Sequence, residues 1–224
     1  MATSTLQIDV APDTAVTALW DAPAKPRAVL VLAHGAGAGM QHKAMAATAE
    51  GLAARGIAVL RYNFPYMERG SKRPDAPRIA EAAVRAAVAE GAARAGGLPL
   101  FAGGRSFGGR MTSQAEAAAP LPQVRGLVFF AFPLHSAGAP AVTRAAHLAK
   151  VALPMLFLQG SRDALAEAAL LRQTVQGLGR RATLHLVPDA DHSFHVPARS
   201  GRTDADTLTD LLDTAAAWMA TSAD

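Results

Sequence analysis

The sequence predicts an α/β fold, with a mostly parallel, doubly wound sheet and antiparallel strands at its N-terminal edge. Short, continuously apolar runs, typical of strands buried on both faces, alternate with longer helix-forming segments. A polar cluster directly follows each buried run. Ligands of such sheets bind beyond the carboxyl ends of the strands, where these clusters would meet. The clusters are His34–Gly39, Asn63–Pro77, Ser106, Phe132–His135, Asp163 and Asp189–His195.

Length and composition bound the class of protein. The 224 residues suit one domain, which we expect to span residues 1–224. Half of the residues are hydrophobic and 18% are charged, which is typical of a globular chain. The sequence contains no cysteine, which excludes disulfides, thiolate nucleophiles and cysteine-ligated zinc.

Charge and hydropathy narrow the choice of partners. The net charge is +4, but the basic residues are scattered, and Lys72-Arg73 and Arg180-Arg181 are the only adjacent pairs. This pattern predicts no nucleic-acid partner. The N-terminus lacks the features of a secretory signal, and no apolar run has the length of a membrane span. We therefore expect a soluble, cytoplasmic protein without a membrane partner.

The N-terminal third predicts a hairpin, two buried strands and a helix. Residues 6–10 and 15–20 alternate apolar and polar side chains around a turn, which indicates a half-exposed edge hairpin. Residues 28–33 and 57–62 are mostly apolar and predict buried strands. A helix is expected between them over 43–55, with a glycine in the usual position after its end.

The middle of the chain continues this alternation. Residues 63–77 carry three prolines and several charges, which predicts a long loop at the mouth of a site. An Ala-rich helix over 78–95 ends at two glycines. A buried strand over 98–102 follows, and then a helix over 107–119 that two prolines stop.

Three further strands and two helices complete the expected sheet. The strands are predicted over 126–132, 155–159 and 183–187, and the helices over 164–178 and 204–221, the latter with Thr203 or Asp204 as N-cap. Residues 133–151 form a crossover with one short helix. This crossover is too short to fold as a separate lid, so we expect no large cap domain.

A G-x-S-x-G sequence, Gly104 to Gly108, lies at the corner between the third buried strand and its helix. A sharp strand-to-helix turn forces the central residue into a strained backbone conformation, and glycines two residues away avoid collisions with the crossing segments. The turn exposes the oxygen of Ser106 at the positive end of the following helix. Ser106 is therefore the candidate nucleophile.

A serine hydroxyl attacks well only when a base accepts its proton, and the base is usually an imidazole held by a carboxylate. In doubly wound hydrolases these groups follow the order Ser, Asp, His. Ser106, Asp163 and His192 follow that order, each after a late strand. His195 is the rival base, but His192 comes sooner after its strand. Asp163 could instead cap the helix expected from Ala164.

The other acidic and histidine side chains have simpler interpretations. Asp189 and Asp191 lie too close to His192 to occupy a separate strand end, and carboxylates in loops most often form turns. His34 is expected to shape its loop. We expect surface or packing roles for His42, His135, His147 and His185. The sequence contains no H-E-x-x-H motif, and its His–Asp pairs at i,i+4 lie in strand or loop, so we expect no metal.

Attack on a carbonyl places negative charge on the substrate oxygen, which needs hydrogen-bond donors already aimed at it. The N–H of Phe107, the residue after the nucleophile, is the first candidate. The loop after His34 offers the second, through Ala36 or Gly37. The residues expected to bind substrate are Gly35, Gly37, Arg105 and Phe132.

Six segments together resemble an α/β-hydrolase. They are His34-Gly-Ala-Gly-Ala-Gly, Arg61-Tyr-Asn-Phe-Pro-Tyr, Gly103-Gly-Arg-Ser-Phe-Gly-Gly-Arg, Phe132-Pro-Leu-His, Leu158-Gln-Gly-Ser-Arg-Asp and Asp191-His-Ser-Phe. More narrowly, the chain resembles a small bacterial group similar to dienelactone hydrolases and to the animal testis-expressed and NSL-complex subunit hydrolase-like proteins. The resemblance covers Val29–Phe194 and implies Ser106, Asp163 and His192 as the catalytic triad. Dienelactone hydrolases proper use a cysteine nucleophile, which this chain lacks.

These observations predict a serine esterase that cleaves small or medium carboxylic esters or thioesters through an acyl-enzyme, without a cofactor. Its partner would be a small-molecule ester, and the sequence makes no prediction about oligomeric state. The basic residues Arg69, Lys72, Arg73 and Arg105 could bind an acid group of the substrate, although pairing with Glu68 or Asp75 is favoured. The alternative function is a non-catalytic interaction module that keeps the fold and binds a partner.

Overall fold

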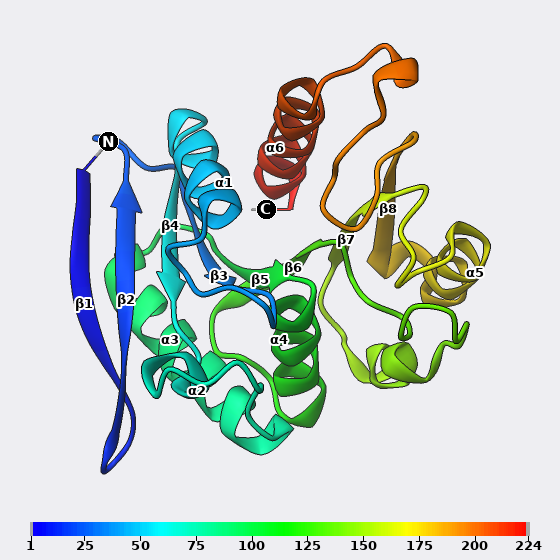
Figure 1. Cartoon of the computed structure of the whole chain (residues 1–224). Coiled ribbons are helices and arrows are strands. Elements are labelled where there is room, and N and C mark those ends of the chain that lie inside the picture. The colour runs from blue at the N-terminus through cyan, green and yellow to red at the C-terminus, as the bar shows by residue number, and fades with distance from the viewer. Residues whose placement is uncertain (1, 223–224) are drawn as a thin grey trace.

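The computed structural model describes residues 2–222 and contains one eight-stranded sheet (Figure 1). The strands are β1 (Ala2–Ala11), β2 (Thr14–Ala22), β3 (Ala28–Ala33), β4 (Ile57–Tyr62), β5 (Leu100–Arg105), β6 (Val124–Phe130), β7 (Met155–Gly160) and β8 (Ala182–Val187). Their order across the sheet is β1-β2-β4-β3-β5-β6-β7-β8. β2 pairs antiparallel with β1 and with β4, and all other neighbours are parallel. The predicted doubly wound sheet with an antiparallel N-terminal edge is confirmed.

Helices cover both faces of the sheet. They are α1 (Lys43–Ala54), α2 (Pro65–Glu68), α3 (Pro77–Ala95), α4 (Phe107–Ala118), α5 (Ala168–Leu178) and α6 (Asp204–Thr221), with short 3-10 helices η1 (Thr143–Lys150), η2 (Gly179–Arg181) and η3 (Ala198–Ser200). α1 and α6 lie on one face, and α3, α4, α5 and η1 lie on the other (Figure 1). η1 is the only helix between β6 and β7, so no cap domain is inserted there. Within residues 2–222, no helix combines the length and the hydrophobicity that a membrane span requires.

The two helix layers explain why the central strands are apolar throughout. In β3, Val29, Val31 and Ala33 belong to the hydrophobic cluster that includes α3 and α4. The alternate residues Ala28, Leu30 and Leu32 belong to the cluster that includes α1 and α6. Side chains of a strand alternate between faces, so a strand covered on both faces has no position left for a solvated side chain.

Turns at their ends shift two of the predicted strands. β5 begins at Leu100 rather than at residue 98, because the N–H of Leu98 bonds back to the carbonyl of Ala95 where α3 ends. β6 ends at Phe130 rather than at residue 132, because Ala131 adopts a positive φ of 57° that a strand does not allow. Both strands therefore end two or three residues from the predicted positions.

The helices and the edge hairpin also differ from prediction. α5 begins at Ala168 rather than at residue 164, because the N–H groups of Leu165 and Ala166 bond to Asp163 and form a turn. α2 interrupts the loop predicted over 63–77. The hairpin is longer than expected and pairs Ala2 with Ala22 at its open end. α6 begins as predicted, with Thr203 and Asp206 forming a reciprocal capping box.

Candidate active site

Ser106 lies at the corner where β5 turns into α4. Its backbone has φ 50° and ψ −114°, a conformation that non-glycine residues rarely adopt, and its N–H donates to the carbonyl of Phe130 at 2.9 Å. A Cβ on Gly104 or on Gly108 would lie 2.5 Å from the carbonyl oxygen of Ala33. The motif therefore needs its two outer glycines because the turn is pressed against the end of β3.

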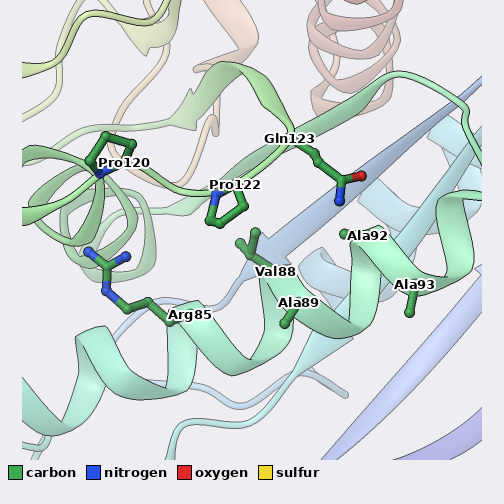
Figure 2. A pocket seen from close by; sticks show the side chains of 8 residues that line it. All are labelled: Arg85, Val88, Ala89, Ala92, Ala93, Pro120, Pro122 and Gln123. Atoms are coloured by element: carbon green, nitrogen blue, oxygen red, sulfur yellow. The ribbon is translucent and has the colours of Figure 1, made fainter.

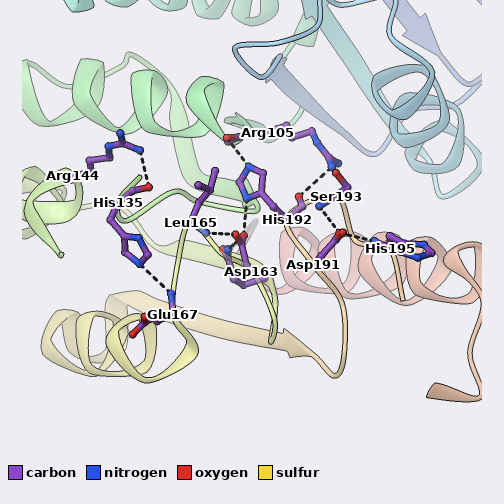
Figure 3. Close-up of polar contacts among 12 residues, drawn as sticks. Arg105, His135, Arg144, Asp163, Leu165, Glu167, Asp191, His192, Ser193 and His195 are labelled. Atoms are coloured by element: carbon purple, nitrogen blue, oxygen red, sulfur yellow. Dashed lines mark hydrogen bonds and ion pairs between the residues drawn. The ribbon is translucent and has the colours of Figure 1, made fainter. Parts of the chain in front are cut away.

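A chain of hydrogen bonds joins Ser106 to two distant loops. His192 Nε2 lies 2.9 Å from Ser106 Oγ, and His192 Nδ1 lies 2.7 Å from Asp163 Oδ2. Figure 3 shows the imidazole of His192 directed at the Asp163 carboxylate. The structure thus brings together the three side chains that their order in the sequence selected, from the ends of β5, β7 and β8.

The Asp163 carboxylate is fully buried, with a side-chain exposure of 0%. Its Oδ1 accepts the N–H of Leu165 at 2.7 Å, and its Oδ2 accepts the side-chain amide of Gln159 as well as the imidazole. A buried carboxylate needs such donors, because an unsatisfied charge in the interior is costly. Asp163 does not cap α5, whose N-cap is Glu167, so that interpretation of the sequence was wrong: one oxygen of Asp163 forms the turn before the helix, and the other holds His192.

The loop that carries His192 has an unusual backbone. Asp189 and Phe194 adopt positive φ angles of 59° and 65°. The Asp191 carboxylate accepts the N–H groups of Ser193 at 2.7 Å and His195 at 3.0 Å, so Asp191 forms the turn that presents His192 (Figure 3). The prediction that these loop carboxylates form turns agrees with this geometry.

The rival base His195 lies elsewhere. Its ring is exposed, and Nδ1 lies 3.0 Å from Asp204 Oδ2 at the start of α6. This contact raises the pKa of His195 and lowers the pKa of Asp204. His195 therefore joins the loop to α6, and only His192 of the two contacts Ser106.

Arg105, the residue before the nucleophile, was expected to bind substrate. In the structure its Nη2 donates to the carbonyl of His192 at 3.3 Å, and its guanidinium carbon lies 5.4 Å from the centroid of the Phe194 ring. Figure 3 shows the Arg105 side chain reaching toward the loop that carries His192 and Ser193. Arg105 thus connects the loop of the imidazole to the strand of the nucleophile.

The loop after His34 lies against Ser106. A Cβ built on Gly35 would lie 3.8 Å from the Cβ of Ser106, and the Tyr66 hydroxyl donates to the carbonyl of Ala36 at 2.9 Å. Phe107 is the first residue of α4, so its N–H has no acceptor within the helix. The N–H of Phe107 and the loop of Gly35 and Ala36 are therefore both next to Ser106, while Gly37 is exposed.

His34 is buried and uses both ring nitrogens to hold this loop. Nδ1 bonds to the carbonyl of Gly35 at 2.7 Å, and Nε2 accepts the N–H of Phe64 at 3.0 Å. Burial lowers the pKa of His34 to about 4, against the opposing effect of the Gly35 hydrogen bond, so the ring is neutral near pH 7. Its role is to shape the loop, in agreement with the sequence-based expectation.

Phe132 requires a correction. It was expected to contact substrate, but its side chain has an exposure of 0%. The ring packs against Phe129 and Phe157, with centroids 5.2 Å and 5.7 Å away. The turn at Ala131 directs it into the core rather than toward Ser106. Phe132 is therefore a core residue, and its side chain is not accessible to a substrate.

Two supporting residues escaped the sequence analysis. Gln159 bonds to the Asp163 carboxylate, and Tyr66 holds the loop of Ala36. The sequence does distinguish Gln159, because it is the one polar side chain in an otherwise apolar strand shortly before Asp163. Tyr66 lies on α2, whose start is fixed by the buried Asp75 carboxylate through the Tyr66 N–H at 2.8 Å. Asp75 also pairs with Arg69, the pairing that the sequence favoured over substrate binding.

An apolar cavity of about 570 Å³ lies between α3 and the segment after α4 (Figure 2). It opens near Pro120 and Gln123, beyond the C-terminal end of α4, whereas Ser106 precedes the N-terminal end. The 12 residues of α4 separate the two by roughly 18 Å. Its one charged lining residue, Arg85, bonds to the carbonyls of Ala115 and Ala119. The cavity offers no group that could act on a substrate.

Comparison with known proteins agrees with this fold. The structure of XC6422 from Xanthomonas campestris, an α/β serine hydrolase without a lid, is 24% identical and has a TM-score of 0.75, with 96% of this chain and 94% of that chain covered. The dienelactone hydrolase from Anabaena variabilis is 18% identical with a TM-score of 0.75, covering 98% and 97%. An α/β serine hydrolase homologue from Coxiella burnetii is 19% identical with a TM-score of 0.76, covering 96% and 98%.

The structural likenesses, at these identities, show a shared fold. A family assignment comes from the sequence itself, because residues 26–220 match the family described as Alpha/beta hydrolase domain. That match includes β3 to β8 and the three side chains that meet at Ser106. The chain therefore belongs to the alpha/beta hydrolase domain family.

Proposed function

We propose that the protein is a serine hydrolase that cleaves a carboxylic ester or thioester through an acyl-enzyme. The observation that carries this proposal is the hydrogen-bonded series Asp163–His192–Ser106, with distances of 2.7 Å and 2.9 Å. The strained backbone of Ser106 supports it further, because strain of about 1–3 kcal/mol persists only where the surrounding structure imposes it.

Each group has a defined part in the reaction. His192 Nε2 accepts the proton of Ser106 as Oγ attacks the substrate carbonyl, and it later returns that proton to the leaving alcohol or thiol. Asp163 fixes the ring with its proton on Nδ1 and stabilises the imidazolium that forms. The N–H groups of Phe107 and Ala36 bind the developing oxyanion, and each such donor typically lowers the barrier by about 3–4 kcal/mol. Water, activated by His192, then releases the acid from Ser106.

The alternative, a non-catalytic interaction module, is weaker. A protein that only binds a partner needs neither a strained serine nor an imidazole within 2.9 Å of its hydroxyl. The resemblance to testis-expressed and NSL-complex hydrolase-like proteins stays a prediction from sequence. The absence of a cap domain favours substrates that approach Ser106 directly, such as small or medium esters.

A comparison of wild type with Ser106→Ala tests the proposal. Wild type should hydrolyse p-nitrophenyl acetate, and the variant should lose on the order of 10⁶ in kcat, as expected when the nucleophile of a triad is removed. A fluorophosphonate probe should label wild type and not Ser106→Ala. The control Ser4→Ala, at an exposed position of β1, should keep full labelling. Equal rates for wild type and Ser106→Ala would overturn the proposal.

A further inference from the structure

Arg110 is a half-buried arginine one helical turn after the nucleophile. Its N–H bonds to the carbonyl of Ser106 at 3.1 Å, and its guanidinium carbon lies 5.9 Å from the centroid of the Phe107 ring. Stacking of this kind holds a guanidinium over the ring while leaving its N–H donors free. Within residues 2–222, the Arg110 side chain has no hydrogen-bond or ion-pair partner, unlike Arg61 and Arg105.

A second arginine, Arg144 on η1, faces the same region as Arg110. Ser113 on α4 lies 2.7 Å from His147 Nε2 on η1, so the two helices touch at this pair. Arg110 precedes Ser113 by three residues, and Arg144 precedes His147 by three. Residues three apart share a face in both helix types, so the two arginines project from the faces that meet. Consistently, burial and the charge of Arg144 both lower the pKa of Arg110.

Arg144 is held in place by neutral groups. Its Nη1 donates to the carbonyl of His135 at 2.8 Å (Figure 3), and its Nη2 donates to the hydroxyl of Ser136 at 2.7 Å. Burial and the nearby Arg110 lower the pKa of His147 to about 4, so this ring adds no charge near pH 7. Within the described chain, neither arginine forms an ion pair with a carboxylate. Two positive charges therefore lie near each other, one of them over the Phe107 ring, without a counter-ion from residues 2–222.

We propose that Arg110 and Arg144 form an anion-binding subsite, so that the preferred substrates are esters carrying a negative charge close to the scissile bond. This inference rests on the proposed function and deepens it. A guanidinium binds a carboxylate or phosphate through paired hydrogen bonds, and a half-buried position strengthens such contacts by limiting solvent screening. Arg110 is the primary contact, because its donors are free. Arg144 adds charge and confines the anion to the side of η1.

Kinetics with matched esters test the subsite. p-Nitrophenyl hydrogen glutarate carries the charge on the acyl side and is compared with neutral p-nitrophenyl pentanoate, with enzyme-free hydrolysis subtracted. 4-Acetoxybenzoate carries it on the alcohol side and is compared with 4-acetoxybenzamide. Wild type should prefer the charged member of at least one pair by kcat/KM. Arg110→Gln should reduce that preference about tenfold, the effect of losing one charge-assisted hydrogen bond.

Further variants separate charge from packing. Arg110→Lys should restore part of the preference, Arg144→Gln should reduce it less than Arg110→Gln, and added NaCl should weaken it in wild type. Arg125→Gln removes the same charge at an exposed position at the opposite end of the sheet and should leave the preference unchanged. A charged-to-neutral ratio that is the same in wild type, Arg110→Gln and Arg144→Gln would overturn the subsite.

A binding measurement keeps this test distinct from the proposed function. Ser106→Ala cannot form an acyl-enzyme, so calorimetry on this variant measures binding alone. Glutarate should bind to Ser106→Ala and bind at least about tenfold more weakly when Arg110→Gln is added. Hydrolysis of the neutral esters without any charge preference or glutarate binding would overturn the subsite alone. Glutarate binding without hydrolysis of any ester would support the subsite and overturn the esterase.

Discussion

The role of Arg105 depends on where its strand ends. Placed one position before the nucleophile, it was expected from sequence to meet the substrate. Because β5 extends through Arg105, the side chain leaves the strand next to the loop of His192 and bonds to the His192 carbonyl. Burial lowers the pKa of Arg105, and the carboxylates of Asp191 and Asp163 oppose that shift. Arg105 is a positioning residue in this arrangement.

We expect Arg105→Met to lower kcat of ester hydrolysis on the order of 10- to 100-fold with little change in KM, because a small displacement of the imidazole is costly while the substrate surface is unchanged. Arg105→Lys should recover part of the rate, since it can still donate to the His192 carbonyl. Arg172→Met, exposed on α5, is the control and should behave as wild type. A rise in KM confined to charged esters would instead indicate that Arg105 binds the substrate.

At the scale of elements, a buried ion pair joins the edge hairpin to the rest of the sheet. Arg61 on β4 donates to Asp21 on β2 at 2.7 Å, and their side chains are 6% and 1% exposed. Thr3 on β1 donates to the other oxygen of Asp21, and Arg61 also donates to the carbonyl of Met40. The pair therefore connects three strands with the end of the loop that approaches Ser106.

Asp21→Ala should reduce the free energy of unfolding by about 3–5 kcal/mol, because it leaves the Arg61 charge buried without its partner. Asp213→Ala is the matched control. It breaks the pair between Arg55 and an Asp213 side chain that is 64% exposed, which should cost less than about 1 kcal/mol. Urea unfolding of both variants measures the difference. The double variant Asp21→Ala/Arg61→Met should be more stable than Asp21→Ala, and equal costs at the two sites would contradict this account.

The elements also show what could be predicted from sequence. The bounds of β3 and β4 were predicted correctly, because continuous burial on both faces leaves a composition that no exposed segment shares. The ends of β6 and α5 were predicted wrongly. The N–H of Ala131, which has a positive φ, bonds to Leu158 on β7, and the Asp163 carboxylate that forms the turn before α5 also bonds to His192 on a distant loop. Local composition carries no record of those contacts.

Across the whole molecule, the position of the site followed from topology, since parallel strands bring the ends of β5, β7 and β8 to one edge. The order Ser106, Asp163, His192 could therefore be read from the sequence. The directions of Arg105 and Phe132 could not, because they depend on backbone angles in the adjoining turns. Two histidines of the molecule, the buried His34 and the half-buried His147, are also neutral near pH 7.

These neutral histidines make the fold sensitive to acid. The pKa of His34 is about 4 in the folded protein and ordinarily about 6.5, so between these values the unfolded chain binds more protons. Its contribution to stability is complete above pH 6.5 and is lost as pH falls toward 4. For a residue with 0% exposure, this loss amounts to about 3 kcal/mol. His147 should behave in the same direction, with a smaller effect because it is only half-buried.

Urea unfolding of wild type and His34→Asn at pH 7.5 and pH 4 isolates this effect, because every other titrating group is common to both proteins and cancels in the difference. The variant should be less stable than wild type at pH 7.5. The gap should narrow by about 3 kcal/mol at pH 4, because protonation of His34 in the unfolded chain then lowers the free energy of unfolding of wild type alone. His147→Gln provides a second, milder comparison should His34→Asn fold poorly. A stability gap that is the same at both pH values would mean that His34 is not held neutral by the fold.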